Sequence, residues 1–168
     1  GAALKRLGVR PGEAVATLAW NSDRHLEAYY AIPSIGAVLH TLNLRLHPDE
    51  LAYIASDAQD AALIVDADLL PVLEQFRARA PFRHVIVIGD GAPPAGMLDY
   101  ERLLAEHADA PPLSEDFDER SAAAMCYTSG TTGKPKGVVY SHRALVLHSL
   151  VQGMTEGFAI RESDIVLP

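Results

Sequence analysis

Short apolar, β-rich runs alternate along the chain with longer segments whose apolar residues recur at helical spacing. The expected strands are Ala14–Trp20, Ala62–Val65, His84–Ile88, Ala122–Tyr127 and Val138–Tyr140. The expected helices run from about Asp23 to Leu39, from Pro48 onward, from about Asp68 to Ala80, near Asp99–Glu106 and after Ser141. Strands that alternate with helices predict βαβ units, and therefore a layered α/β fold with a largely parallel sheet flanked by helices.

Turn and capping residues set the expected element boundaries. Asn21 or Ser22 can cap the first long helix, and Pro33 should kink or interrupt it because proline lacks an N–H donor. Pro48 followed by two acidic residues is typical of a helix start. The proline-rich, acidic segment Asp109–Glu119 is expected to be an exposed connection.

Composition and charge narrow the class of protein. The 168 residues are 49% hydrophobic and 21% charged, which is typical of a folded globular protein rather than a disordered one. A net charge of −8 disfavours nucleic acid as a partner. No stretch of eighteen apolar residues occurs, so no transmembrane segment is expected. A single cysteine, Cys126, excludes an internal disulfide and fits a reducing compartment, so we expect a cytoplasmic protein.

The two ends of the chain resemble internal segments. The chain opens on Gly1-Ala2-Ala3 without a methionine, already in a helical pattern, and closes on the apolar run Ile165–Pro168. We therefore expect residues 1–168 to be part of a larger domain, truncated at both ends.

One loop carries most of the chemical information. Gly130, Gly133 and Gly137 would let the backbone adopt positive φ and approach a ligand closely. Successive N–H groups in such a loop can form an anion-binding concavity, and the interleaved threonine and serine hydroxyls suit phosphate oxygens or a Mg²⁺ shell. Lys134 and Lys136 add positive charge to an acidic chain. The residues predict a polyphosphate-binding loop.

Other phosphate motifs do not fit this loop. In the P-loop pattern a Ser or Thr follows the lysine, but Pro135 follows Lys134, and Thr128 stands where the first glycine belongs. No G-x-G-x-x-G sequence is present. A plain surface turn is the remaining alternative. With residue frequencies of ~5–8%, the probability that nine specified positions match by chance is on the order of 10⁻¹⁰ per starting position. This probability disfavours a plain surface turn.

The run Thr128–Gly137 (TSGTTGKPKG) resembles the signature of the AMP-forming acyl-adenylating superfamily, which includes acyl-CoA synthetases, peptide-synthetase adenylation domains and firefly luciferase. Lys134 falls where that signature varies. The segments Val138–Leu145, Leu18–Ser22 and Val38–Leu46 are similar to the fatty-acyl-CoA synthetase branch. The resemblance covers nearly the whole chain, but only the loop is highly specific.

The resemblance implies a two-step reaction. A carboxylic acid, here a medium- or long-chain fatty acid, attacks the α-phosphate of ATP to give acyl-AMP and pyrophosphate, and coenzyme A then displaces AMP. Thr128 is the expected Mg²⁺ ligand, and phosphoryl chemistry of this kind depends on positioning and charge neutralisation. The residues expected to contact the departing phosphates are Thr128, Ser129, Gly130, Thr131, Thr132, Gly133 and Lys136.

The resemblance also implies what residues 1–168 lack. In the family the adenine site, the ribose-binding aspartate, the acidic Mg²⁺ ligand and the catalytic lysine lie downstream, the last on a separate C-terminal domain. The chain is therefore expected to be a partial N-terminal AMP-binding domain that is inactive alone, with no catalytic residue of its own. Rival interpretations are a ligase for an aryl or amino acid and a non-catalytic nucleotide-binding module. A homodimer is compatible with the sequence.

Several other residues have a structural and a functional interpretation. His142 and Arg143 follow the expected helix cap Ser141, and the resemblance places them near the acyl pocket, although they could simply begin a helix. His40 is expected to have a structural role, in which it caps and bridges the strands of the sheet. Cys126, in an apolar strand, is expected to be a core residue rather than a nucleophile. Core aromatic positions are expected for three residues: Trp20, Tyr29 and Tyr30.

Overall fold

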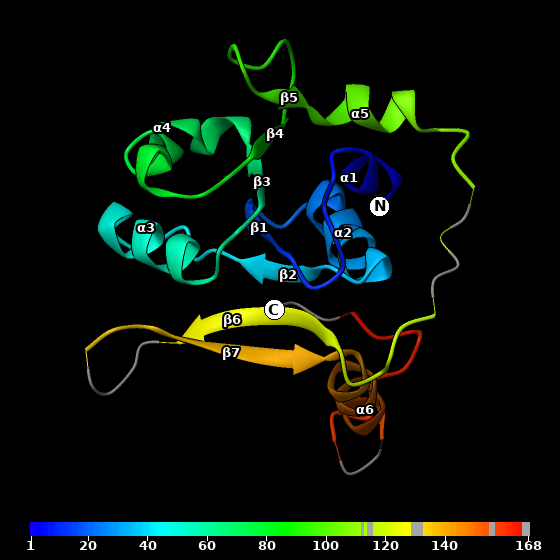
Figure 1. Cartoon of the computed structure of the whole chain (residues 1–168). Helices are drawn as coiled ribbons and strands as arrows, with labels where there is room; N and C mark the ends of the chain where they lie inside the picture. The colour runs from blue at the N-terminus through cyan, green and yellow to red at the C-terminus, as the bar shows by residue number, and fades with distance from the viewer. Residues whose placement is uncertain (112, 114–115, 129–132, 155–156, 166–168) are drawn as a thin grey trace.

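The computed structural model describes residues 1–111, 113, 116–128, 133–154 and 157–165, and these residues build one mostly parallel sheet (Figure 1). Its seven strands lie in the order β5-β4-β3-β1-β2-β6-β7, and β7 alone runs antiparallel to its neighbour. The strands are β1 (Ala14–Leu18), β2 (Val38–Thr41), β3 (Ala62–Asp66), β4 (His84–Ile88), β5 (Leu98–Asp99), β6 (Ala122–Thr128) and β7 (Lys136–Ser141). The predicted layered α/β fold with a largely parallel sheet is confirmed.

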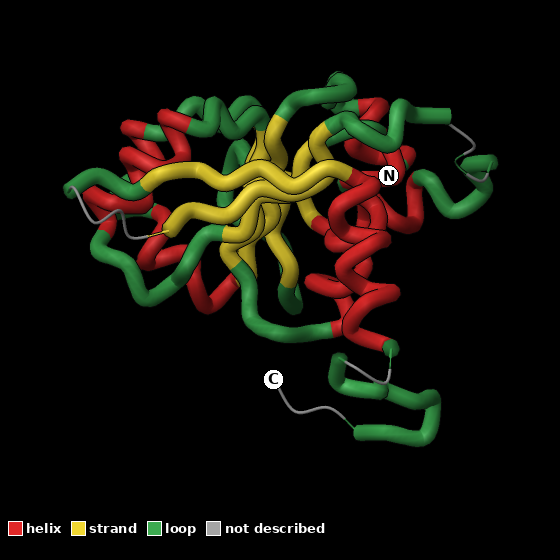
Figure 2. Tube along the Cα trace, turned by 90° about the horizontal axis from the view of Figure 1, so that it is seen from below, coloured by secondary structure: helices red, strands yellow, loops and turns green. Residues whose placement is uncertain are grey.

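Helices cover both faces of the strands β1 to β4, as expected for parallel strands joined by helical crossovers (Figure 2). The α-helices are α1 (Ala2–Arg6), α2 (Asp23–Ala31), α3 (Pro48–Asp57), α4 (Leu70–Leu73), α5 (Tyr100–Glu106) and α6 (His142–Gly153). Three 3₁₀ turns are η1 (Pro33–Ile35), η2 (Ala67–Leu69) and η3 (Arg77–Arg79). Figure 1 shows α3 and α4 on one side of the central strands and α1, α2 and α5 on the other.

Alternate side chains of the central strands feed two separate cores. On one face Leu51 of α3 and Leu73 of α4 pack with Leu63 of β3, all of them fully buried. On the other face Ile32, which follows α2, packs with Ile64 of β3. Each buried side chain of this size contributes about 1.5–3 kcal/mol of transfer free energy, so the two cores hold the helices against the sheet.

The predicted long helix from Asp23 to Leu39 is wrong in its second half. The helix α2 ends at Ala31, a 3₁₀ turn follows at Pro33, and Gly36 takes a left-handed conformation with φ of 73°. Proline lacks the N–H that a helix requires, and glycine in this conformation ends the turn, so the chain is free to extend. Val38–Thr41 then forms β2. The sequence does not predict this strand, because its apolar residues continue the helical spacing of the preceding segment.

The predicted helix from Asp68 to Ala80 is also broken. It forms η2, the four-residue α4 and η3, with Pro71 in the first turn of α4. The helix starts predicted at Ser22 and Pro48 are confirmed. Ser22 accepts a hydrogen bond from the His25 N–H, and Pro48 opens α3.

The hairpin of β6 and β7, together with α6, has a largely exposed apolar surface. No residue of α6 is buried, and Val146, Leu150 and Val151 are more than half exposed. The expectation that Trp20, Tyr29 and Tyr30 are core aromatics is wrong, because they are 48%, 47% and 74% exposed. Among the described residues, none of the helices combines the length and the apolar character needed to span a bilayer.

Candidate phosphate-binding site

The candidate loop connects two strands at the carboxyl edge of the sheet. β6 pairs parallel with β2, so its C-terminal residue Thr128 lies at the edge where β2 also ends. β7 returns antiparallel, and Thr128 lies opposite Lys136 in the register. Ligands of open α/β sheets bind beyond this edge. The exposed Thr128 hydroxyl and Lys136 ammonium therefore begin and end the candidate site.

Two loop glycines serve different purposes. Gly133 has φ of 112°, in the region that glycine alone tolerates well, as the sequence predicts. Gly137 does not have positive φ, so the prediction for it is wrong. Its hydrogen instead faces the Tyr127 ring, where an added Cβ would lie 3.1 Å from Cζ. A larger residue at position 137 would therefore need the Tyr127 ring to shift by a few tenths of an ångström.

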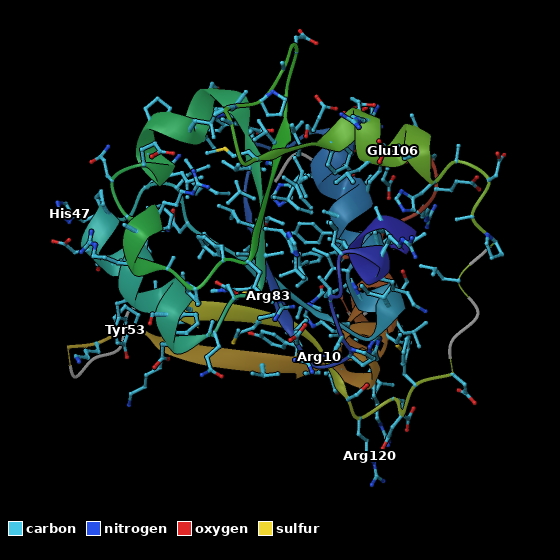
Figure 3. All side chains as sticks on the ribbon, turned by 45° about the horizontal axis from the view of Figure 1, so that its top comes forward. Arg10, His47, Tyr53, Arg83, Glu106 and Arg120 are labelled. Carbon is cyan, nitrogen blue, oxygen red and sulfur yellow. The ribbon has the colours of Figure 1, made fainter. Side chains whose placement is uncertain are left out.

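The two lysines differ in their surroundings. The Lys134 ammonium lies 5.1 Å from the centre of the Tyr53 ring on α3, a cation–π contact. Figure 3 shows Tyr53 on α3, near the end of the hairpin at which β7 begins. Lys136 is exposed and forms no salt bridge within the described residues. Of the two cations, Lys136 is the one left for an anionic ligand.

Tyr127, the residue before Thr128, is fixed at its hydroxyl group. The hydroxyl donates a 2.7 Å hydrogen bond to Oδ2 of Asp57, the last residue of α3. Burial and, secondly, this bond raise the pKa of the Tyr127 phenol above its ordinary value, so the hydroxyl stays a donor. The sequence alone does not point to Asp57 or Tyr53. Their spacing of four on a predicted helix shows a shared face, but not what that face contacts.

A buried polar pair lies beneath Tyr127. His40 of β2 and Asp60 are both fully buried, and His40 Nδ1 lies 2.9 Å from each carboxylate oxygen. Burial raises the pKa of Asp60, while the contact with His40 opposes that change. The His40 ring centre is 5.2 Å from that of Tyr127. The expected structural role of His40 is confirmed, since it links β2 to Asp60 at the end of the α3 segment.

His142 and Arg143 fix the start of α6. The His142 ring stacks on Phe117 with centres 5.7 Å apart, and Arg143 forms a 3.1 Å salt bridge with Glu119. Ser141 caps the helix by accepting the Ala144 N–H. These contacts fit the structural interpretation of both residues, whose role in an acyl pocket stays a prediction.

Cys126 is exposed, so the expectation that it belongs to the core is wrong. Ala123 and Met125 of β6 are buried, and side chains alternate along a strand, so Cys126 points to the opposite face. There it borders an apolar cavity of about 550 Å³. The cavity lies between α2, β2, the hairpin and α6, and its lining includes Tyr29, Tyr140 and His148.

Four predicted phosphate contacts, Ser129 to Thr132, lie outside the described residues. Within the part that the structure describes, no group of three or more His, Cys, Asp or Glu residues could hold a metal. Magnesium in nucleotide sites commonly takes only one or two protein ligands and completes its shell with phosphate and water oxygens. The exposed Thr128 hydroxyl, with phosphate oxygens, fits such an ion.

The chain is an α/β protein with a candidate phosphate-binding loop at the carboxyl edge of its sheet. Residues 1–168 match the family described as AMP-binding enzyme, and the chain belongs to that family.

Two similar proteins are CoA ligases. The chain is 52% identical over 165 residues to a long-chain-fatty-acid–CoA ligase of Thermus thermophilus, covering 98% of the chain and 30% of the relative. It is 42% identical to a 3-methylmercaptopropionyl-CoA ligase of Ruegeria lacuscaerulensis, covering 100% of the chain and 32% of the relative. The chain thus spans about a third of the length of these relatives.

A solved structure agrees with this family membership. An anthranilate CoA ligase in complex with anthranoyl-AMP superposes with a TM-score of 0.81 at 32% identity. The match covers 91% of this chain and 29% of that one.

Proposed function

We propose that residues 1–168 are the N-terminal part of the AMP-binding domain of an acid–CoA ligase that uses ATP. The enzyme would activate a medium- or long-chain fatty acid through acyl-AMP and transfer the acyl group to coenzyme A. Membership of the AMP-binding enzyme family and the 52% identity to a long-chain-fatty-acid–CoA ligase support this proposal. A cytoplasmic location, and a homodimer as one compatible assembly, belong to the same proposal.

The observation that carries the proposal is the pairing of Thr128 with Lys136 at the carboxyl edge of the sheet. A hydroxyl and an ammonium group without a salt-bridge partner among the described residues lie where the two strands open into the loop. An anion there would meet a cation that the acidic chain has not neutralised. Lys134, by contrast, is already engaged with Tyr53.

In the proposed reaction the loop binds the β- and γ-phosphates. Lys136 would neutralise charge that accumulates on the departing pyrophosphate, and Thr128 would bind Mg²⁺ together with phosphate oxygens. Mg²⁺, when bound, would spread that charge further. The backbone at Gly133 and the residues 129–132 would supply N–H and hydroxyl donors.

A ligase for an aryl acid is a second candidate, favoured by the similarity to the anthranilate CoA ligase. The loop itself does not separate acids, because it contacts phosphates and not the acyl group. An amino-acid ligase and a non-catalytic nucleotide-binding module are further alternatives that activity measurements distinguish.

The experiment is acid-dependent exchange of pyrophosphate into ATP by the full-length protein, followed by CoA-dependent AMP release. We expect exchange with fatty acids of eight or more carbons to exceed exchange with benzoate, anthranilate and amino acids. Lys136→Ala should lower kcat/KM for ATP by about a hundredfold, since a charged contact contributes about 1.5–3 kcal/mol. Lys5→Ala, a lysine of α1, is the matched control and should change little.

Preference for aryl or amino acids would replace the substrate class and leave the reaction intact. Absence of exchange with every acid, together with measurable ATP binding, would support the non-catalytic module. Residues 1–168 alone are expected to form no acyl-CoA. Formation of acyl-CoA by that piece would contradict the proposed division of the site.

A further inference from the structure

The helix α3 contacts both ends of the candidate loop through one face. Tyr53 and Asp57 are four residues apart, and therefore neighbours on the surface of α3. Asp57 accepts the hydrogen bond from Tyr127 at the end of β6, and Tyr53 lies under the ammonium of Lys134 just before β7. Two segments that enter and leave the loop thus meet the same turn of one helix.

The position of Asp57 is unfavourable for the helix taken alone. A carboxylate in the last turn faces the negative end of the helix dipole, and Asp57 has no salt-bridge partner among the described residues. The acceptor at this point serves the Tyr127 hydroxyl instead. A local rule broken at the edge of a ligand site indicates a role in that site.

Tyr127 is held on three sides. Its hydroxyl is bound to Asp57, its ring lies against the buried His40, and Gly137 on β7 leaves space for it. His40 is itself fixed by the fully buried Asp60. The position of the Tyr127 ring is therefore fixed relative to α3 and β2. Because Thr128 is the next residue in the chain, its position is constrained as well.

We infer that Tyr53, Asp57 and Tyr127 are positioning residues that place Thr128 and Lys136 for binding of the nucleotide's phosphates. The inference rests on the proposed function of the loop. None of the three contacts the nucleotide in this account; they act by fixing the two ends of the loop before the ligand arrives. Preorganised donors bind charge more tightly than donors that must be ordered on binding.

A merely structural role predicts a different pattern. If the contacts only stabilise the fold, their removal lowers the stability of the protein and leaves the KM values of the folded enzyme unchanged. If they position the loop, their removal raises KM for ATP selectively, and the KM for the acid stays near that of the wild type.

The variants are made in the full-length protein. Tyr127→Phe removes the donor and keeps the ring, Asp57→Ala removes the acceptor, and Asp57→Asn restores one. Tyr53→Leu removes the aromatic face under Lys134, whereas Tyr53→Phe keeps it. The matched control is Tyr100→Phe, because the Tyr100 hydroxyl donates a 2.8 Å hydrogen bond to Glu27 on the opposite face of the sheet.

We expect Tyr127→Phe and Asp57→Ala to raise KM for ATP about tenfold, as for loss of one hydrogen bond to a charged group. Tyr53→Leu should raise it about threefold, since an exposed cation–π contact is weaker. Asp57→Asn, Tyr53→Phe and Tyr100→Phe should stay within about twofold of the wild type. An unchanged KM for ATP in Tyr127→Phe, Asp57→Ala and Tyr53→Leu would overturn the inference, as would an equal rise in the KM for the acid.

Hydrogen–deuterium exchange without ligand separates this inference from the proposed function. The backbone amides of residues 133, 134, 136 and 137 should exchange faster in Tyr127→Phe and Tyr53→Leu than in Tyr100→Phe. If these variants exchange faster but the full-length protein does not bind ATP, the proposed function is contradicted. The contacts of Tyr53 and Tyr127 would then only stabilise the hairpin. Normal exchange and normal KM for ATP in an active enzyme would refute the inference alone. Tyr53→Leu and Asp57→Ala supply the test if Tyr127→Phe does not fold.

Discussion

Replacement of Gly137 by alanine tests the packing beneath the loop. An added Cβ would lie 3.1 Å from Tyr127 Cζ, 3.2 Å from Tyr127 Cε2 and 3.3 Å from Met125 Sδ. The ring must shift by a few tenths of an ångström to restore ordinary contact. Asp57 and His40 hold the ring on its other sides, so that shift strains the hydrogen bond to Asp57.

The expected magnitude follows from two opposing terms. Overpacking of a fitted site costs about 1–3 kcal/mol. Replacement of glycine by alanine restricts the unfolded chain, which returns about 0.4–1 kcal/mol. Gly137→Ala should therefore lower the free energy of unfolding by about 1–2 kcal/mol.

Urea denaturation of the wild-type and variant proteins measures this difference at a common m-value. Gly153→Ala is the matched control, because nothing lies within 4 Å of a Cβ added at the end of α6. That variant should be as stable as the wild type or slightly more stable. Combining Gly137→Ala with Tyr127→Leu should remove most of the cost, since the obstructing ring is gone. A stabilising effect of Gly137→Ala alone would refute the packing argument.

Two further predictions concern stability away from the loop. Glu13 accepts hydrogen bonds from Arg83 at 2.8 Å and from the Arg10 N–H at 2.9 Å, and these contacts lower its pKa from 4.5 to about 2 (Figure 3 labels both arginines). Because the folded-state pKa is depressed, the stabilisation is complete above pH 4.5 and is lost as the pH falls toward 2. Glu13→Gln should therefore cost about 1 kcal/mol at pH 7 and progressively less as the pH falls through 2. A cost that is independent of pH in denaturation curves would contradict this. Ser141→Ala, which removes the α6 cap, should lower the free energy of unfolding by about 1 kcal/mol. Ser141→Asp keeps an acceptor for the Ala144 N–H and should retain most of the wild-type stability. Equal losses in the two variants would argue against the cap.

Local sequence patterns predict much of the fold. Apolar runs locate all five expected strands within two residues at each end, and βαβ alternation predicts the parallel sheet. The strand Val38–Thr41 is missed because its apolar residues continue the spacing of the preceding helix past Pro33. Helical or strand periodicity is a property of one segment. The strand β2 is buried because it pairs with β1 and β6. That pairing depends on other segments of the chain and is not visible in the residues of β2 alone.

The candidate site divides in the same way. The loop signature identifies Thr128 and Lys136 because glycine, hydroxyl and lysine at fixed spacing suffice for an anion site. Their support by Tyr53 and Asp57 is not readable from the sequence, since it depends on how α3 packs across the sheet, 70 residues from Tyr127 along the chain in the case of Asp57. The exposure of Cys126 is likewise a consequence of which face of β6 meets the core.

The central claim is that the hairpin of β6 and β7 binds the phosphates that leave ATP. A crystal structure of the full-length protein with ATP or a non-hydrolysable analogue and Mg²⁺ tests it most directly. The claim predicts β- and γ-phosphate oxygens within hydrogen-bond distance of the Thr128 hydroxyl and the Lys136 ammonium. Phosphates bound elsewhere, with Thr128 and Lys136 facing solvent, would contradict it.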